Sequence, residues 1–224
     1  MYYVQLLQVP LHGSLDRLSR LNEWRSLIWD LRDVDGITNV VWGSQHEDKK
    51  TQALVISNRE AMKLGWASYN AQTIWAASVE YATWMSKIKS LANGPPYEDV
   101  LLLPEPVDEI LTADVVEIVS WVHPTSQIDE EKKSLLERGF LKFQEAIDNL
   151  DSGVHAGLVG GWGQIEFVDE GVHCRRFTSF IGWESVQAHY DCKLTPPFVE
   201  NIQWLMDKNE RRLEMVHYVF DGVF

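Results

Sequence analysis

The stretch that decides the fold runs from residue 155 to residue 189 and reads HAGLVGGWGQIEFVDEGVHCRRFTSFIGWESVQAH. Its first part, His155 to Glu166, predicts a strand that is unusually rich in glycine. Asp169-Glu170-Gly171 predicts a hairpin turn, and Cys174 to Ile181 predicts the next strand. Helical sequence begins at about Ser185. The stretch therefore predicts two strands joined by a tight turn and followed by a helix.

The residues on either side extend this stretch into a larger unit. Val115 to Val122 predicts a strand, and residues 129–150 predict an amphipathic helix, because their apolar positions form one continuous stripe. Pro196-Pro197 interrupts the helix that begins at about Ser185, and helical sequence resumes from Phe198 to Lys208. Leu213 to Phe220 predicts a last strand. The second half thus has the order strand–helix–strand–strand–helix–strand.

The first half of the chain repeats this order. Its predicted elements are a strand at Tyr3–Val9, a helix at about 15–33, strands at Ile37–Gln45 and Thr51–Ser57, a helix at about 68–92 and a strand at Val100–Leu103. Pro104-Glu105-Pro106 is the best linker candidate between the halves. We therefore expect two domains, 1–106 and 113–224.

Short matches inside the two halves support a duplication. Trp42-Gly43 corresponds to Trp162-Gly163, and Gly65-Trp66 corresponds to Gly182-Trp183. Residues 58–64 separate the Gly65 pair from its strand, whereas the Gly182 pair follows its strand directly. The first half therefore carries an insertion, or its Gly-Trp pair matches by coincidence.

An element order of βαββαβ is the ferredoxin-like motif, which covers only one face of its sheet with helices. Two such units can cover their open faces by packing sheet against sheet. We therefore expect an α+β fold in which two tandem ferredoxin-like units form an α/β barrel.

The segment Phe180–His189, FIGWESVQAH, resembles a strand-to-helix junction of antibiotic-biosynthesis monooxygenase-like proteins. These proteins belong to the dimeric α/β-barrel superfamily, and the two-repeat form is similar to proteins found in fungi, including enzymes of secondary metabolism. The resemblance implies a range of activities: cofactor-free monooxygenases, polyketide cyclases, dehydratases, decarboxylases, isomerases, haem-handling proteins and stress proteins. The fold therefore does not select the chemistry.

Composition narrows the classes of partner. A formal net charge of −13 and the lack of a basic stripe disfavour nucleic acid. No run approaches the roughly 18 apolar residues that span a bilayer, and no signal peptide is visible, so we expect a cytoplasmic protein without a membrane partner. Cys174 and Cys192 are expected to be free thiols. The composition leaves open whether the chain forms a homodimer.

No phosphate-binding loop, zinc ligand set or nucleophile elbow is visible, so we expect no cofactor and no metal, although one histidine would suffice as an axial haem ligand. Histidine is the usual acid–base group near neutral pH. For any single histidine a structural role is the commoner one. His189 is the first catalytic candidate because it lies in the family-like segment, and His46 is the candidate in the first half.

The leading hypothesis is a cofactor-independent enzyme of secondary metabolism that acts on a hydrophobic aromatic or polyketide-like small molecule as a cyclase, dehydratase, isomerase or monooxygenase. Trp162 and Trp183 are expected to wall the cavity, with Gln164 or Tyr190 stabilising an enolate or phenolate. His155 and His217 are further substrate-binding candidates. The alternative hypothesis is a non-catalytic binding or stress-response protein.

Overall fold

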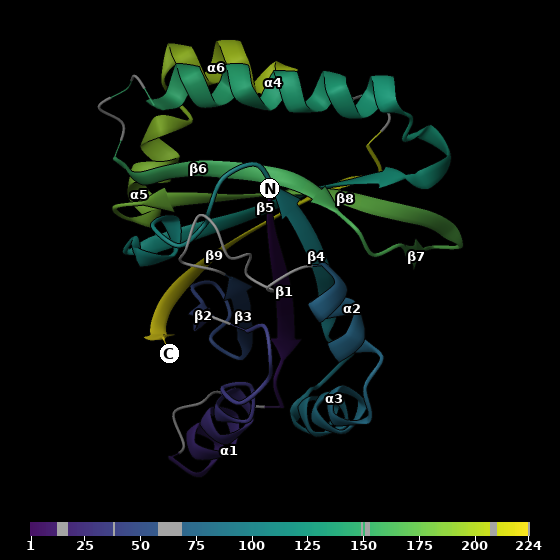
Figure 1. Ribbon diagram of the computed structural model, residues 1–224. Helices are drawn as coiled ribbons and strands as arrows, with labels where there is room; N and C mark the ends of the chain where they lie inside the picture. The colour runs from purple at the N-terminus through teal and green to yellow at the C-terminus, as the bar shows by residue number, and fades with distance from the viewer. Residues whose placement is uncertain are drawn as a thin grey trace. The chain divides into compact units, whose positions relative to one another are not determined.

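The computed structural model describes residues 1–12, 18–37, 39–57, 69–148, 150, 153–206 and 210–223, and Figure 1 shows its helices and strands. The chain forms two compact units. Unit 1 comprises Met1–Asp108 together with the chain from Tyr218 onward, and unit 2 comprises Glu109–His217. The α+β fold class that the sequence predicts is confirmed.

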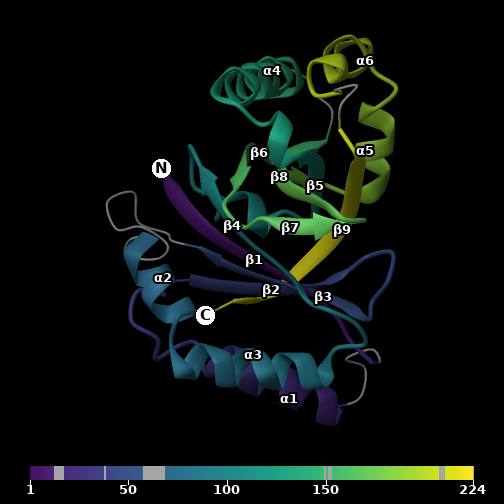
Figure 2. The same ribbon diagram turned by 90° about the vertical axis from the view of Figure 1, so that its right-hand side faces the viewer.

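Unit 1 is an antiparallel sheet with helices packed on it. Its elements are β1 (Tyr2–Pro10), α1 (Leu18–Trp29), β2 (Asn39–Gln45), β3 (Thr51–Ser57), α2 (Tyr69–Ala76), α3 (Val79–Leu91) and β4 (Tyr97–Leu103). The strands lie in the order β2-β3-β1-β4, and the end of the last strand, β9 (Arg212–Val223), pairs with β2. Figure 2 shows α1 and α3 side by side beneath these strands. The Nε1 of Trp84 on α3 donates to the carbonyl of Leu27 on α1 over 2.8 Å, which fixes this helix pair.

Two helices replace the single helix predicted at about 68–92. The helical pattern breaks at Ala77 and Ser78, and the hydroxyl of Ser78 then accepts a hydrogen bond of 3.0 Å from the backbone N–H of Tyr81. This is an N-cap, and it starts a new helix at Val79. The Gly65-Trp66 pair lies outside the described residues.

Unit 2 has its own antiparallel sheet. Its elements are η1 (Ile110–Thr112), β5 (Val115–Pro124), η2 (Thr125–Gln127), α4 (Glu130–Asp148), β6 (Val154–Gly163), β7 (Phe167–Asp169), β8 (Val172–Trp183), α5 (Val186–Cys192), α6 (Pro196–Asn201), η3 (Ile202–Trp204) and the first part of β9. Strand β8 pairs with β5 along one edge and with β6 and β7 along the other, and β9 lies beside β5. Figure 1 shows α4 and α6 together over one face of these strands.

Two glycines of β6, Gly157 and Gly160, have different structural roles. A Cβ on Gly160 would lie 3.0 Å from ring atoms of Phe140 and of Phe177, so two aromatic rings occupy the space that a side chain would fill. Gly157 has a φ of 83° and lies where the register of β6 against β8 shifts, as at a bulge. The absence of a side chain at Gly160 therefore lets the core of unit 2 pack closely against β6 and leaves no open volume there.

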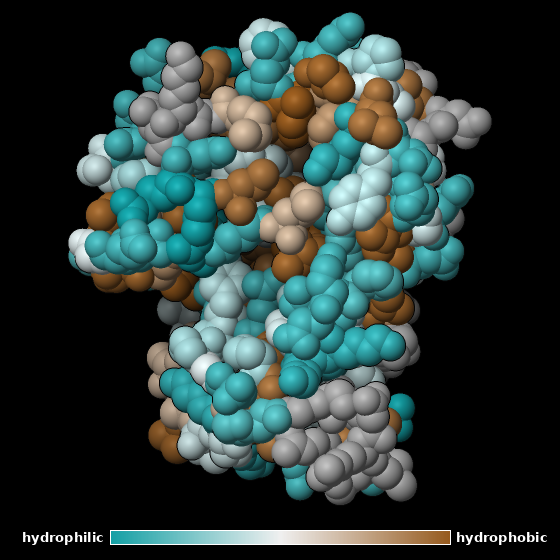
Figure 3. Space-filling model, turned by 180° about the vertical axis from the view of Figure 1, so that it is seen from behind, coloured by the Kyte–Doolittle hydropathy of each residue, from teal (hydrophilic) through white to brown (hydrophobic). Residues whose placement is uncertain are grey.

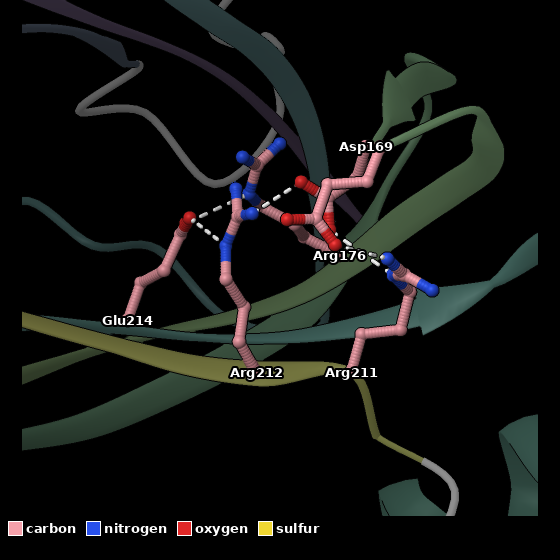
Figure 4. A network of polar contacts seen from close by, with 6 residues as sticks. Asp169, Arg176, Arg211, Arg212 and Glu214 are labelled. Carbon is pink, nitrogen blue, oxygen red and sulfur yellow. Dashed lines mark hydrogen bonds and ion pairs between the residues drawn. The ribbon is translucent and has the colours of Figure 1, made fainter.

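The predicted hairpin turn at Asp169-Glu170-Gly171 is confirmed between β7 and β8, with left-handed φ angles of 47° at Glu170 and 82° at Gly171. An ionic network ties this hairpin to the start of β9 (Figure 4). Arg211 contacts Asp169 over 3.1 Å, Arg212 also pairs with Asp169, and Glu214 receives Arg176 over 3.0 Å and Arg212 over 2.7 Å. Hydrogen bonds from Arg211 and Arg212 hold the pKa of Asp169 below its ordinary value, although burial opposes this.

The predicted interruption of the second helix is present, but it lies before the prolines: α5 ends at Cys192, and Pro196 and Pro197 begin α6, which ends at Asn201. Proline is well tolerated in the first turn of a helix, where its missing N–H is not needed. Within the described ranges, every helix is too short or too polar to traverse a bilayer. A common origin of the two units and a face-to-face packing of their sheets stay predictions.

Candidate functional site

A cavity of about 210 Å³ lies within unit 2, between the sheet and the helices that cover it. Most of its wall is apolar, with side chains from the strands and from α4 that include Val119, Trp121, Phe140, Phe143, Ile181 and Met215. Met206 also lines the cavity and is half exposed, so the wall reaches the surface there. Figure 3 shows apolar side chains, coloured brown, among those on the surface of unit 2. An engineered cavity of about 150 Å³ holds benzene, so this volume suits a molecule of one or two rings.

Three polar side chains interrupt the apolar wall: Glu117, His189 and Lys193. Glu117 is on β5, where Glu117, Val119 and Trp121 share one face because side chains alternate along a strand. His189 is on α5, which begins where the Ser185 hydroxyl accepts a hydrogen bond of 3.0 Å from Ala188 N–H. Lys193 follows one turn after His189 and so lies on the same side of the helix.

A chain of buried polar contacts includes two of the residues that line the cavity, Glu117 and His189. The Nε1 of Trp183 donates to Oε2 of Glu117 over 2.9 Å, and Oε1 of Glu117 lies 3.7 Å from Nε2 of His189. The other ring nitrogen of His189, Nδ1, lies 2.8 Å from Nε2 of His217 on β9. The exposed fractions of Glu117, His189 and His217 are 4 %, 2 % and 0 %.

Two aromatic rings stack on the imidazole of His189 and restrict the orientation of its plane. The ring of Trp183 stacks on it at 5.0 Å between centroids and 30° between planes, and the ring of Tyr190 stacks on it at 5.3 Å and 18°. With the plane fixed, one nitrogen faces Glu117 and the other faces His217. This arrangement suits a base, since its reactive atom has one orientation.

The electrostatics of the trio favour proton transfer. A buried carboxylate is costly unless it is hydrogen-bonded or paired. Glu117 accepts a hydrogen bond from the N–H of Trp183, and an imidazolium at His189 would neutralise the charge of its carboxylate. A proton that reaches His189 therefore forms an ion pair with a carboxylate already in place.

The same three residues have the composition of a two-histidine, one-carboxylate metal site, and a possible ligand atom from each lies within 4.8 Å of the others. Their orientation does not suit one ion. Glu117 faces Nε2 of His189 while His217 faces Nδ1, and the lone pairs of these two nitrogens diverge. One ring would have to turn before the three could converge on an ion.

A larger and more open groove of about 860 Å³ lies in unit 1 beside α2 and α3. Acidic side chains, among them Asp33, Asp35 and Glu80, line part of it, and Lys87 pairs with Asp30 over 3.0 Å. The groove has the larger volume of the two. The smaller cavity is the better candidate for a catalytic site, because two of its lining side chains, Glu117 and His189, are titratable, buried and close to each other. We therefore place the candidate site in unit 2.

The structure brings four of the residues predicted from the sequence together. His189 lines the cavity, Trp183 contacts Glu117, His217 contacts His189, and the ring of Tyr190, which is 46 % exposed, stacks on that of His189.

The other predicted site residues lie elsewhere. Trp162 packs in the apolar core, with its ring centroid 5.6 Å from that of Phe177. Gln164 follows β6 and donates to the carbonyl of Trp162 over 2.9 Å. His46 is exposed after β2 in unit 1. The backbone of His155 is part of β6, and its side chain is outside the described part of the chain.

Sequence reasoning missed Glu117 and Lys193. Glu117 had a usable signal, because it is the one charged residue in the otherwise apolar run from Val115 to Val119. A charge at an inward position of a buried strand is rare unless it is paired. Lys193 had no signal of this kind, since a lysine near the end of a short helix is ordinary.

No protein-family model and no curated protein matches this sequence. The fold is similar to that of an anthrone oxidase-like protein, with a TM-score of 0.68 at 12 % identity, covering 100 % of this chain and 93 % of that one. It is also similar to structures named "putative monooxygenase" from Lactobacillus acidophilus NCFM and from Fusobacterium nucleatum subsp. nucleatum. Both have a TM-score of 0.57 at 10 % identity and cover 99 % of this chain and 94 % or 93 % of theirs. The chain therefore shares its α+β fold with these three proteins.

Proposed function

We propose that this protein is an enzyme that removes a proton from a small, mainly apolar molecule bound in the cavity of unit 2. The observation that carries the proposal is that an apolar cavity of about 210 Å³ ends at the buried pair of Glu117 and His189. Apolar walls with a few convergent polar groups are typical of small-molecule sites. A buried carboxylate beside an imidazole is an arrangement of general acid–base catalysis.

Each polar group has a role in this reaction. His189 accepts the proton, and Glu117 balances the positive charge that results. The electron pair stays on the substrate as an enolate or phenolate. Lys193 is the cationic side chain in the cavity wall and stabilises that anion. Stabilisation by Lys193 takes the place of the roles expected for Gln164 and Tyr190.

The cavity also favours a hydrogen-bond acceptor on the substrate. Trp121 lines the cavity with 2 % of its surface exposed, and its Nε1 has no acceptor among the described residues. A buried donor of this kind calls for a partner. A carbonyl or hydroxyl oxygen of a ligand would supply one, and a two-ring ketone combines such an oxygen with acidic C–H bonds.

Enolate formation is the first step of several reactions, including isomerisation, cyclisation, elimination and attack on oxygen. The fold likeness to an anthrone oxidase-like protein and to proteins named as monooxygenases supports a reaction of this group. Independence from cofactors, a place in secondary metabolism, a cytoplasmic location and a homodimer stay predictions. A non-catalytic binding protein would use the same cavity without turnover.

Solvent deuterium exchange tests the proposal. The probe is 2-tetralone, a two-ring ketone, incubated in D₂O while proton NMR follows loss of its benzylic signal. We expect the protein to accelerate exchange, and His189→Gln to lower the rate about 100-fold, a usual scale for a general base. The matched control is His173→Gln, an exposed histidine of unit 2, which should exchange at the wild-type rate. Equal rates for wild type and His189→Gln would contradict the proposal.

A further inference from the structure

A second hollow of unit 2, a groove of about 250 Å³, lies between α4 and η3. Its apolar part is formed by Leu135, Trp204 and Met206, which are 57 %, 46 % and 50 % exposed, so the groove is open to solvent. Gly139 lets α4 and η3 approach each other here, because a Cβ on this residue would lie 2.5 Å from the carbonyl oxygen of Trp204. The walls of the groove are therefore held by close packing of backbone against backbone.

The charged side chains known to line this groove are all cationic: Lys132, Arg138 and Lys142. Arg138 and Lys142 are one turn apart on α4, so they lie on the same side of the helix. Arg138 donates to a neighbouring hydroxyl, and the Nζ of Lys142 lies 4.2 Å from the centre of the Trp204 ring. Within the described ranges neither has an ion-pair partner, whereas acidic side chains lie near Lys132. In a chain of net charge −13, such a groove selects anions.

Met206 joins this groove to the cavity, because its side chain lines both. The residues before it divide between the two hollows: Leu205 lines the cavity, and Trp204 lines the groove. A methionine side chain is unbranched and adapts its shape to what passes it. A ligand that extends outwards from the cavity past Met206 therefore enters the cationic groove.

We propose that the substrate is an aromatic carboxylic acid whose rings occupy the cavity and whose carboxylate binds Arg138 and Lys142 in the groove. This inference rests on the proposed function and names the class of its substrate. The charges also orient the ligand, since the buried carboxylate of Glu117 repels an anion inside the cavity and the two cations attract it outside. The uncharged end of the molecule is thereby presented to His189. Two exposed cations should together strengthen binding about tenfold.

A matched pair of ligands tests the proposal. The probes are 6-hydroxy-2-naphthoate and 6-hydroxy-2-naphthamide, which have the same two rings and differ in charge at one end. A second pair, with two methylenes before the carboxylate or amide, covers a longer reach. In calorimetry at pH 7 and low salt, we expect the acid of at least one pair to bind about tenfold more tightly than its amide. Added salt should reduce this preference, because exposed charges are screened. Equal affinities within both pairs, as when the groove serves a protein partner, would overturn the proposal.

Two double variants locate the cations responsible. Arg138→Gln with Lys142→Gln should reduce the acid-to-amide affinity ratio from about ten to about one. Both residues are on the exposed side of α4, so the fold should tolerate the change. The matched control is Lys87→Gln with Lys133→Gln, which removes two cations that do not line the groove and should leave the ratio near that of wild type. An equal fall in both double variants would mean a general effect of net charge and would overturn the assignment.

A filled cavity separates this inference from the proposed function. Val119→Phe should abolish binding of the amide and weaken binding of the acid, because one ligand occupies both hollows. Full affinity for the acid in this variant would mean that the groove binds anions alone, and it would overturn the substrate class. If 2-tetralone exchanges but the acid-to-amide ratio is one, the reaction stands and this inference fails. If the ratio depends on Arg138 and Lys142 but no exchange occurs, the ligand class stands and the proposed reaction fails.

Discussion

The indole N–H of Trp183 donates a hydrogen bond of 2.9 Å to the carboxylate of Glu117, and both side chains are buried. Sheet register creates this pair, because Glu117 on β5 lies opposite Ile181 on β8, and Trp183 follows two residues later on the same face. The bond leaves the second oxygen of Glu117 directed at His189, 3.7 Å away. Trp183 was expected in the cavity wall, but it contributes to the site by orienting the carboxylate of Glu117, and other side chains line the cavity.

Two substitutions of Glu117 separate its charge from its hydrogen bond. Glu117→Gln keeps an acceptor for Trp183 but loses the charge that balances a protonated His189. We expect it to lower the exchange of 2-tetralone about 10- to 100-fold while the melting temperature stays near that of wild type. Glu117→Leu also leaves the Trp183 N–H without its acceptor, which should reduce the free energy of unfolding by about 1–3 kcal/mol in urea denaturation. An unchanged exchange rate in Glu117→Gln would show that the carboxylate has no part in the reaction.

Trp121→Phe removes the indole N–H at the cavity wall and keeps an aromatic ring. A ligand with an oxygen acceptor should then bind about 5- to 10-fold more weakly, the usual effect of one hydrogen bond. Calorimetry with 2-naphthol measures this effect, and naphthalene, which has no oxygen, is the control ligand. If both ligands weaken equally, the change lies in packing, and the indole N–H does not contact the ligand.

His123 should make the protein sensitive to mild acid. Burial, together with the nearby charge of Lys132, lowers the pKa of this histidine to about 4. The unfolded chain binds the proton at about pH 6.5 and the folded protein only near pH 4, so stability falls as pH drops through this interval. The loss should be on the order of 2 kcal/mol. Urea denaturation at pH 7 and pH 4.5 should show a smaller loss for His123→Asn than for wild type, and an equal loss would refute the assignment.

The Asp169 network should act at lower pH. Because the folded pKa of Asp169 is depressed below the ordinary 3.8, its contribution is present above that value and is lost as pH falls through the folded pKa. Asp169→Asn should lower the melting temperature at pH 7 and flatten the pH dependence of that temperature below pH 4. Salt should weaken the network, since Arg212 is 43 % exposed. Glu130→Gln is a matched control, because its exposed pair with Lys133 lies within one helix. Equal melting temperatures for Asp169→Asn and wild type at pH 7 would contradict this role.

Local sequence patterns predicted much of the fold. The helix at 129–150 and the turn at Asp169-Glu170-Gly171 depend on short-range periodicity or on residues with restricted backbones, and the structure contains both, whereas the helix break expected at Pro196 lies just before it. The break between α2 and α3 was missed because Ser78 is a polar residue in an otherwise helical pattern. Its capping role depends on where its hydroxyl lies.

The site was predicted only in part, because its residues come from four elements, β5, β8, α5 and β9, and only β8 and α5 are adjacent in sequence. His189 was found through a local segment, and His217 was expected to bind substrate but contacts His189. Trp162 was expected in the cavity wall, yet it packs in the core, where the Phe140 and Phe177 rings fill the space beside Gly160. The pairing of Glu117 with Trp183 and His189 depends on strand register and on the position of α5, neither of which a single sequence specifies.

The central claim is that the cavity of unit 2 holds a ligand with its reactive carbon beside His189, and intermolecular NOEs test it most directly. The protein would carry ¹³C-labelled methyl groups and histidines, with 2-tetralone as the ligand. We predict NOEs from its benzylic protons to Hε1 of His189 and from its rings to the methyl groups of Val119, Ile181 and Met215. Val119→Phe, which fills the cavity, should abolish them. NOEs confined to Ile74 and Val79 in the groove of unit 1, or NOEs that persist in Val119→Phe, would contradict the account.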